Sequence, residues 1–336
     1  MKTNKIISAV ILLSIFVLSG CNIFYDNNNG EFTGLYKSGI ESLNKGDTTQ
    51  AGNYFKQSIR KYNDAPSLYE LSEIYLKENT FHSRSLAYEN LRNAVFIQPE
   101  NLKYRFAYAD LMREMARASS FGQYKKILEI DSTQFRAWLS LAELKDEDFT
   151  EYNRSGRQLS DVFFGSLQEY ANEDFDESEK YYLKVIEYDS LNYGANLKLA
   201  LLYEKAGKSG KGIQYLQNLI NSKKDDKDVH LCLGLLYYKT RNFEKCYAEY
   251  KRALALMNRE EREDFTFNSV KFLLEPAFED VIDKLDDYQL SNFIKEYWRI
   301  YDPLYMTDYN ERLLEHYSRV AYANLHFSVP KAGSVI

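Results

Sequence analysis

The chain reads LSDVFFGSLQEYANEDFDESEKYYLKVIEYDSLN at 159–192, YGANLKLALLYEKAGKSGKGIQYLQNLINSKKDD at 193–226 and KDVHLCLGLLYYKTRNFEKCYAEYKRALALMNRE at 227–260. These consecutive blocks are each 34 residues long and carry similar residue types at the same offsets. The eighth position is small in every block, and the twenty-seventh is small or aliphatic: Ser166, Ala200 and Gly234, then Val185, Leu219 and Ala253. A fixed period of this kind indicates that one supersecondary unit is repeated along the chain.

Two helices are predicted within each block. In 227–260, apolar residues recur at three- and four-residue steps from Leu231 to Tyr237, and again from Phe243 onward. The polar residues 240–242 separate the two runs. The period and the small eighth residue resemble the tetratricopeptide (TPR) family. That resemblance implies an all-α fold, a TPR-type helical-hairpin solenoid in which stacked repeats close a shared core.

The residues before these blocks predict more divergent TPR-like helical repeats over 34–158. Gly39 and Phe55 occupy the eighth and twenty-fourth positions of the first copy, as Gly234 and Tyr250 do in the last block. The polar stretch 145–157 stands where a second helix is expected, and it predicts an insertion or a distorted turn. We therefore expect about six or seven helical pairs, followed by a helical C-terminal extension over 261–336.

The first residues predict a lipoprotein signal peptide over 1–20. A positively charged start precedes the apolar run 6–18, which is shorter than the about 20 residues of a membrane-spanning helix. The Leu-Ser-Gly-Cys sequence at 18–21 resembles a bacterial lipobox, which implies cleavage before Cys21 and lipidation of that cysteine. An ordinary secretory signal followed by an incidental cysteine is the alternative.

A membrane-anchored lipoprotein of the cell envelope is the localisation that follows. Residues 21–33 are polar and include an Asn-Asn-Asn-Gly run, so they predict a flexible tether between lipid and repeats. Asn22 rather than Asp follows the cysteine, and by resemblance to proteobacterial sorting rules this favours the outer membrane. Two or more acyl chains hold a protein stably on a bilayer.

A second resemblance covers roughly residues 290–330. The sequences YWRIYDP at 297–303 and YSRVAYAN at 317–324 resemble the start of the GWxTD domain, a family found in envelope lipoproteins. The Gly-Trp-x-Thr-Asp motif itself should follow Phe327, and the sequence reaches Ile336 without it. Either the protein is truncated or the remainder of that domain is absent. The matching residues are Trp298, Asp302, Pro303, Asn310, Glu311, Arg319, Tyr322 and Asn324.

Composition excludes several classes of function. The net charge is −6, and an acidic chain without a basic cluster is not expected to bind nucleic acid. Four scattered histidines have no metal-ligand spacing and are expected at the surface, so no metal, cofactor or catalytic site is predicted. The Gly-Lys-Ser at 207–209 lacks the earlier glycine and strand of a phosphate loop. Cys232 and Cys246 are expected as buried free thiols, although a disulfide stays possible in an envelope protein.

The predicted binding surface is a concave groove. In TPR proteins it is lined by the first helix of each repeat, and this resemblance assigns the groove to Phe163, Leu167, Tyr170, Leu197, Leu201, Glu204, Leu231, Leu235 and Tyr238. A groove so apolar should be covered. Either a segment of another envelope protein binds there, or the chain's own C-terminal helices fill it. The sequence thus predicts a non-enzymatic protein-interaction scaffold; the alternatives are a GWxTD-type enzymatic or assembly role, or a mere C-terminal cap.

Overall fold

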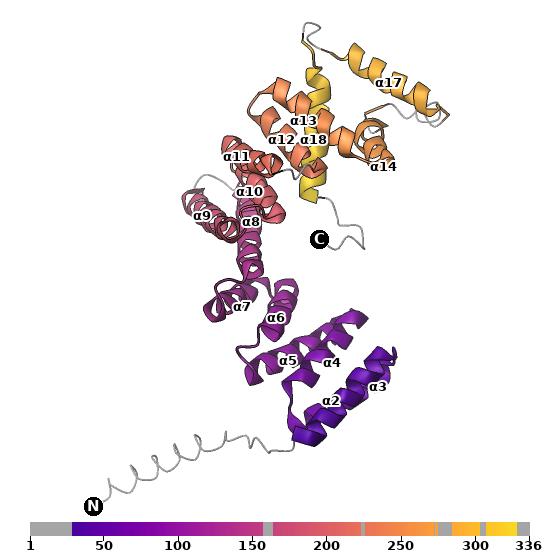
Figure 1. The fold of residues 1–336 in the computed structure, drawn as a ribbon. Coiled ribbons are helices and arrows are strands. Elements are labelled where there is room, and N and C mark those ends of the chain that lie inside the picture. The colour runs from indigo at the N-terminus through magenta and orange to yellow at the C-terminus, as the bar shows by residue number, and fades with distance from the viewer. Residues whose placement is uncertain are drawn as a thin grey trace, which may run out of the picture. The chain divides into compact units, whose positions relative to one another are not determined.

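The computed structural model describes residues 29–156, 164–222, 226–271, 273–274, 284–302 and 307–327 (Figure 1). Within these ranges the chain is helical and has no strand, which confirms the predicted all-α class. It divides into two compact units, Met1–Gln123 and Tyr124–Ile336. Six successive pairs of helices are followed by a helical C-terminal region, in agreement with the predicted number of helical pairs.

Unit one begins with helical hairpins. Its helices are α2 (Asn29–Asn44), α3 (Thr48–Tyr62), α4 (Ala65–Glu78), α5 (Phe81–Ile97) and α6 (Leu102–Met115), and α7 (Arg117–Ile130) runs across the unit boundary. A Cβ on Gly39 would collide with the buried ring of Phe55, so the small residue lets α2 and α3 approach closely. Since α2 begins at Asn29, residues 29–33 are helical, and the tether predicted over 21–33 is too long by that segment.

Unit two contains two regular repeats. Its first helices are α8 (Phe135–Gly156), α9 (Phe164–Tyr188), α10 (Tyr193–Lys205), α11 (Ser209–Asn221), α12 (Lys227–Lys239) and α13 (Phe243–Leu256). Blocks 193–226 and 227–260 each form the predicted pair, α10 with α11 and α12 with α13. The turns contain Gly207 at φ +70° and Arg241 at φ +57°, at the same repeat offset. Gly207 therefore serves as a helix-ending residue in a turn and not as part of a phosphate loop.

Block 159–192 does not form the predicted pair. Residues 164–188 are one helix, α9, which packs against α8. The offset at which Gly207 and Arg241 adopt positive φ carries Glu173 here, and Glu173 stays within the helix. The prediction for 145–157 is also wrong over its described part, because α8 runs through 145–156 without interruption.

The C-terminal region turns back onto the last repeat. It consists of α14 (Arg259–Glu263), a π-helical turn η1 (Asp264–Asn268), α15 (Ser269–Lys271), α17 (Asp287–Ile300) and α18 (Glu311–Phe327). Helix α18 packs on α12 and α13, as its position across both ribbons in Figure 1 shows. Leu314, Tyr317 and Ala321 join the core that α12 and α13 form. Asn310 caps α18, because its Oδ1 accepts a hydrogen bond from Leu313 N at 2.9 Å.

Candidate functional site

Helix α18 lies over the part of the concave groove that α12 forms. Leu231 and Leu235 are 3% and 1% exposed, and both were expected to line an accessible groove. Tyr238 is partly buried, and its ring lies 5.7 Å from Phe243, which in turn lies 6.2 Å from Tyr309. These contacts bury the groove under the chain's own helix, so at α12 the second of the two sequence interpretations applies.

A buried ion cluster fixes the far end of α18 on α10. Glu204 has a side chain only 3% exposed, with Lys239 Nζ at 3.0 Å and His326 Nε2 at 3.3 Å. Burial alone would raise the pKa of Glu204, but the neighbouring His326 and Lys239 leave it below its ordinary value. The carboxylate therefore stays charged; it attracts the Lys239 ammonium of α12 and lies beside the His326 ring of α18.

The other predicted groove residues fall into two groups. Leu201 is buried and Leu197 is partly buried, and both pack in or against the core that contains α12 and α18. Tyr170 lies on α9 and is 56% exposed. The side chain of Leu167 and the whole of Phe163 lie outside the described residues. The structure thus brings six of the nine residues together and separates Tyr170 from them.

Two polar groups in the last repeat differ from expectation. His230 is 1% exposed, not a surface residue, and its Nδ1 lies 2.5 Å from Glu249 Oε2 across the α12–α13 pair. Cys232 and Cys246 are both buried and free, as expected for small core residues. Burial raises the pKa of the Cys246 thiol to about 12, so it is protonated and unreactive at neutral pH.

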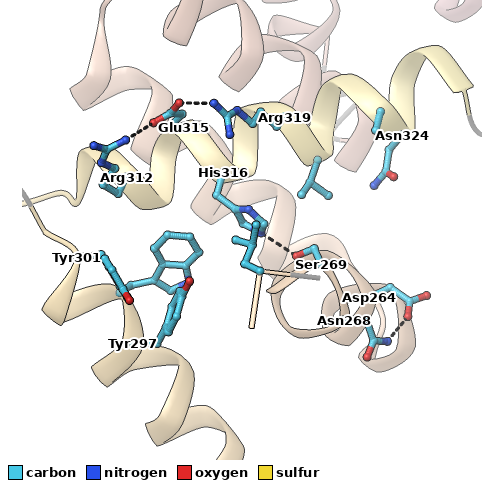
Figure 2. Close-up of a pocket in the computed structure, with 14 residues that line it drawn as sticks. Asp264, Asn268, Ser269, Tyr297, Tyr301, Arg312, Glu315, His316, Arg319 and Asn324 are labelled. Carbon is cyan, nitrogen blue, oxygen red and sulfur yellow. Dashed lines mark hydrogen bonds and ion pairs between the residues drawn. The ribbon is translucent and has the colours of Figure 1, made fainter. Parts of the chain in front are cut away.

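A pocket of about 710 Å³ lies on the other side of α18. Figure 2 shows Tyr297 of α17 and Tyr301, the residue after that helix, on one side of His316 of α18. Asp264, Asn268 and Ser269 from η1 and α15 lie across the opening. Arg312 and Arg319 share Glu315, at 3.2 and 2.6 Å. With Asp264 across the opening, the two arginines face two carboxylates, so the formal charges around the pocket balance.

The residues that resemble a GWxTD domain support this pocket. Trp298 is 7% exposed, its indole lies 5.0 Å from the His316 ring, and its Nε1 is buried without a partner. Asn310 donates to the backbone oxygen of Trp298, and Glu311 accepts from Thr307 at 3.1 Å. Arg319 and Asn324 line the pocket.

The remaining residues of that resemblance lie elsewhere. Tyr322 is 37% exposed and packs 4.3 Å from the His326 ring, on the groove side of α18. Asp302 is partly exposed at the end of α17, and Pro303 lies outside the described residues, as does Cys21. The segment resemblance therefore combines pocket residues with residues that hold α18 in place.

His316 was missed by sequence reasoning as a site residue and was expected at the surface. It is 9% exposed, and its Nε2 lies 2.9 Å from Ser269 Oγ. Burial, assisted by the positive charge of Arg319, lowers the pKa of His316 below its ordinary value. His316 lies four residues after Arg312 and three before Arg319 on an amphipathic helix, and this spacing is the signal that could have placed it on the pocket side.

Neither metal chemistry nor membrane spanning is indicated by the described residues. No group of three or more histidine, cysteine or acidic side chains in these ranges could hold a metal ion. Among the described helices, none combines the length and the apolar character that crossing a bilayer requires.

Comparison with known proteins yields structural likenesses only. No protein-family model matches the chain, and no curated protein matches it. A crystal structure of MamA protein is 16% identical over 61% of this chain and 96% of its own, with a TM-score of 0.41. PilW, described as a widely conserved type IV pilus biogenesis factor, is 16% identical over 68% of this chain and 94% of its own, with a TM-score of 0.47. A tetratricopeptide repeat protein from Parabacteroides merdae is 16% identical over 69% and 96%, with a TM-score of 0.34.

Proposed function

We propose that this protein is a lipid-anchored scaffold of the cell envelope that binds a segment of another envelope protein on the concave face of its helical repeats. The observation that supports the proposal is the docking of α18 onto α12, since it exemplifies an amphipathic helix held by this type of surface. In unit one, Tyr36 and Tyr69, from the first helices of the first two hairpins, are only partly buried. That unit is therefore where we place the partner.

The anchor is proposed at Cys21, with the protein held at the outer membrane. The support is the order of charge, apolar run, small residues and cysteine over 1–21, together with Asn22. A Cys21→Ser variant is expected to lose incorporation of labelled palmitate and to leave the membrane fraction. Incorporation that survives this substitution would refute the anchor.

Site-specific photo-cross-linking in native membranes tests the binding surface. A benzoyl-phenylalanine in place of Tyr36, whose shape it approximates, is expected to form a protein adduct. The same group at Glu89, which is exposed on α5, is the control and should form none. If neither position, nor a third at Tyr69, gives an adduct, the scaffold proposal fails.

A second candidate function is favoured by the pocket beside α18. A largely apolar pocket of about 710 Å³ with an unpartnered indole N–H has the character of a small-molecule site. It would give the GWxTD-like region an enzymatic or assembly role of its own. Under this alternative, changing Asp302, Asn310, Glu311 or Arg319 abolishes the cellular function while the cross-link from Tyr36 persists.

A further inference from the structure

Three tyrosines lie on one face of unit one. Tyr36 comes from α2, Tyr69 from α4 and Tyr104 from α6, so successive hairpins each contribute one ring from their first helix. The rings of Tyr69 and Tyr104 are stacked, with centroids 5.2 Å apart. Tyr104 is 7% exposed, whereas Tyr36 and Tyr69 are accessible at their edges.

Carboxylates accompany these rings. Asp64 is 8% exposed; its Oδ2 accepts from Ser67 N at 2.8 Å, and its Oδ1 is buried without a hydrogen-bond partner. A buried carboxylate oxygen without a donor is costly, by about 1–3 kcal/mol or more. Asp64 therefore places a carboxylate charge beneath this face without a second hydrogen-bond donor of its own.

The tyrosine hydroxyls are neutral, so the charge of this face comes from its acids. Burial, with contributions from Tyr36, Glu70 and Asp64, raises the pKa of Tyr104 to about 12. The same two acids add to the effect of burial on the pKa of Tyr36, which is also raised. Asp64 and Glu70 are thus electrostatically coupled to Tyr36 on α2 and to Tyr104 on α6.

The chain's own Lys103 provides direct evidence of what this face accepts. Its Nζ lies 4.0 Å from the centroid of the Tyr69 ring and 3.7 Å from Glu70 Oε1. A cation over a tyrosine face within about 6 Å is attracted by the ring quadrupole. The Lys103 side chain is nevertheless 62% exposed, so it occupies only the rim.

We infer that the tyrosine face, formed by Tyr36, Tyr69, Tyr104, Asp64 and Glu70, binds a lysine or arginine side chain of the partner segment. The rings supply cation–π attraction, Glu70 supplies an ion-pair partner at the surface, and the buried Asp64 adds its negative charge from beneath. The partner is therefore a basic segment. This inference rests on the proposed function, because it names the chemistry of the segment that the scaffold holds.

The binding experiment uses two fluorescein-labelled ten-residue peptides with the full-length protein in detergent. One peptide carries three lysines in an alanine–glycine background, and the other carries three glutamates at the same positions. Fluorescence anisotropy is expected to give at least about ten-fold tighter binding of the lysine peptide. The affinity should fall as salt is added, since ion pairing contributes to it.

Matched variants locate the site. Asp64→Asn preserves the cap of α4, because asparagine caps about as well as aspartate, yet it removes the charge. Combined with Glu70→Gln, it should weaken lysine-peptide binding about ten-fold. Glu89→Gln, which removes one exposed charge from α5 in the same unit, should leave the affinity within about two-fold.

Two further substitutions separate a binding role from a structural one. Tyr69→Phe retains the ring and should retain binding, whereas Tyr69→Leu should lose it several-fold. Lys103→Ala removes the internal cation from Tyr69 and should strengthen binding of the lysine peptide. A structural defect would instead weaken lysine-peptide binding in all three variants.

Equal affinity for the two peptides, or an equal loss in Glu89→Gln, would overturn the inference. An adduct from Tyr36 in membranes combined with no preference for the lysine peptide would retain the scaffold function and reject the basic partner. Absence of any adduct would reject the scaffold function itself.

Discussion

Ser178 Oγ donates a hydrogen bond to the backbone oxygen of Ala142 at 2.9 Å, although the two residues are 36 positions apart. In the regular repeat, Gly212 meets Ala200 in the equivalent place, where a Cβ would lie 3.1 Å from the Ala200 oxygen. The packing of a normal hairpin is thus conserved between α8 and α9. The residues between Ala142 and Ser178 lengthen both helices without changing the contact between these two positions.

A shortened hairpin should therefore fold. Replacing residues 149–174 with Gly-Lys, the turn found at 207–208, should leave a regular repeat, because the contacts of Ala142, Ser178 and Tyr182 lie outside the removed segment. Circular dichroism should show less helix but a single cooperative thermal transition. A broad transition would mean that the segment is required for folding.

Leu235 and Tyr170 should respond very differently to truncation, although both were predicted to line the groove. Leu235→Ala removes a side chain that is 1% exposed beneath α18, and it should lower the free energy of unfolding by about 2–5 kcal/mol. Tyr170→Ala, on the exposed face of α9, should change it by no more than about 0.5 kcal/mol. Urea unfolding measures both, and equal costs would contradict the docked position of α18.

The glycine at the eighth repeat position should be irreplaceable. A Cβ on Gly234 would lie 2.5 Å from the ring of Tyr250, so Gly234→Ala should destabilise the protein by at least about 1–3 kcal/mol. Gly210→Ala is the control, since nothing lies within 4 Å there; it should be neutral or stabilising by up to about 1 kcal/mol. Thermal unfolding of the pair decides the matter, and a tolerated Gly234→Ala would disprove the close approach of α12 and α13.

The pocket side of α18 should be sensitive to pH. Because the pKa of His316 is lowered in the folded state, protons bind the unfolded chain more readily. Its contribution to stability is full above the ordinary histidine pKa of about 6.5 and is lost as the pH falls through the folded pKa. The melting temperature should drop between pH 7.5 and 5.5, and the drop should be smaller in His316→Phe. An unchanged drop in that variant would assign the effect to other groups.

The sequence was sufficient for the fold class because its repeat signal resides in residues that must be small. Gly39, Ala200 and Gly234 mark hairpins that the structure contains. It was insufficient for block 159–192, where the eighth and twenty-seventh residues match but the turn residue does not. The repeat pattern reflects side-chain size at the helix contacts. It does not report the positive φ angle that Gly207 and Arg241 adopt in the turns.

The candidate site was only partly predictable for a different reason. Repeat offsets identify which residues face the concave side, and they placed Leu231, Leu235 and Tyr238 there. They carry no information on what lies opposite, because α18 meets the last repeat through contacts between residues far apart in the sequence, such as Tyr250 and Ser318, 68 positions apart. The tyrosine face was missed because groove residues were assigned only in the three regular blocks, although Gly39 already sets the register for Tyr36.

The return of α18 also sets an order of events during synthesis. Each hairpin can close as soon as its own residues emerge, but the apolar groove of Leu231 and Leu235 stays uncovered until the last helix arrives. At about 5–20 residues per second, that delay is on the order of ten seconds. During this interval the nascent protein exposes the apolar surface that α18 later covers. A chaperone that binds exposed leucine side chains would bind the chain at this surface.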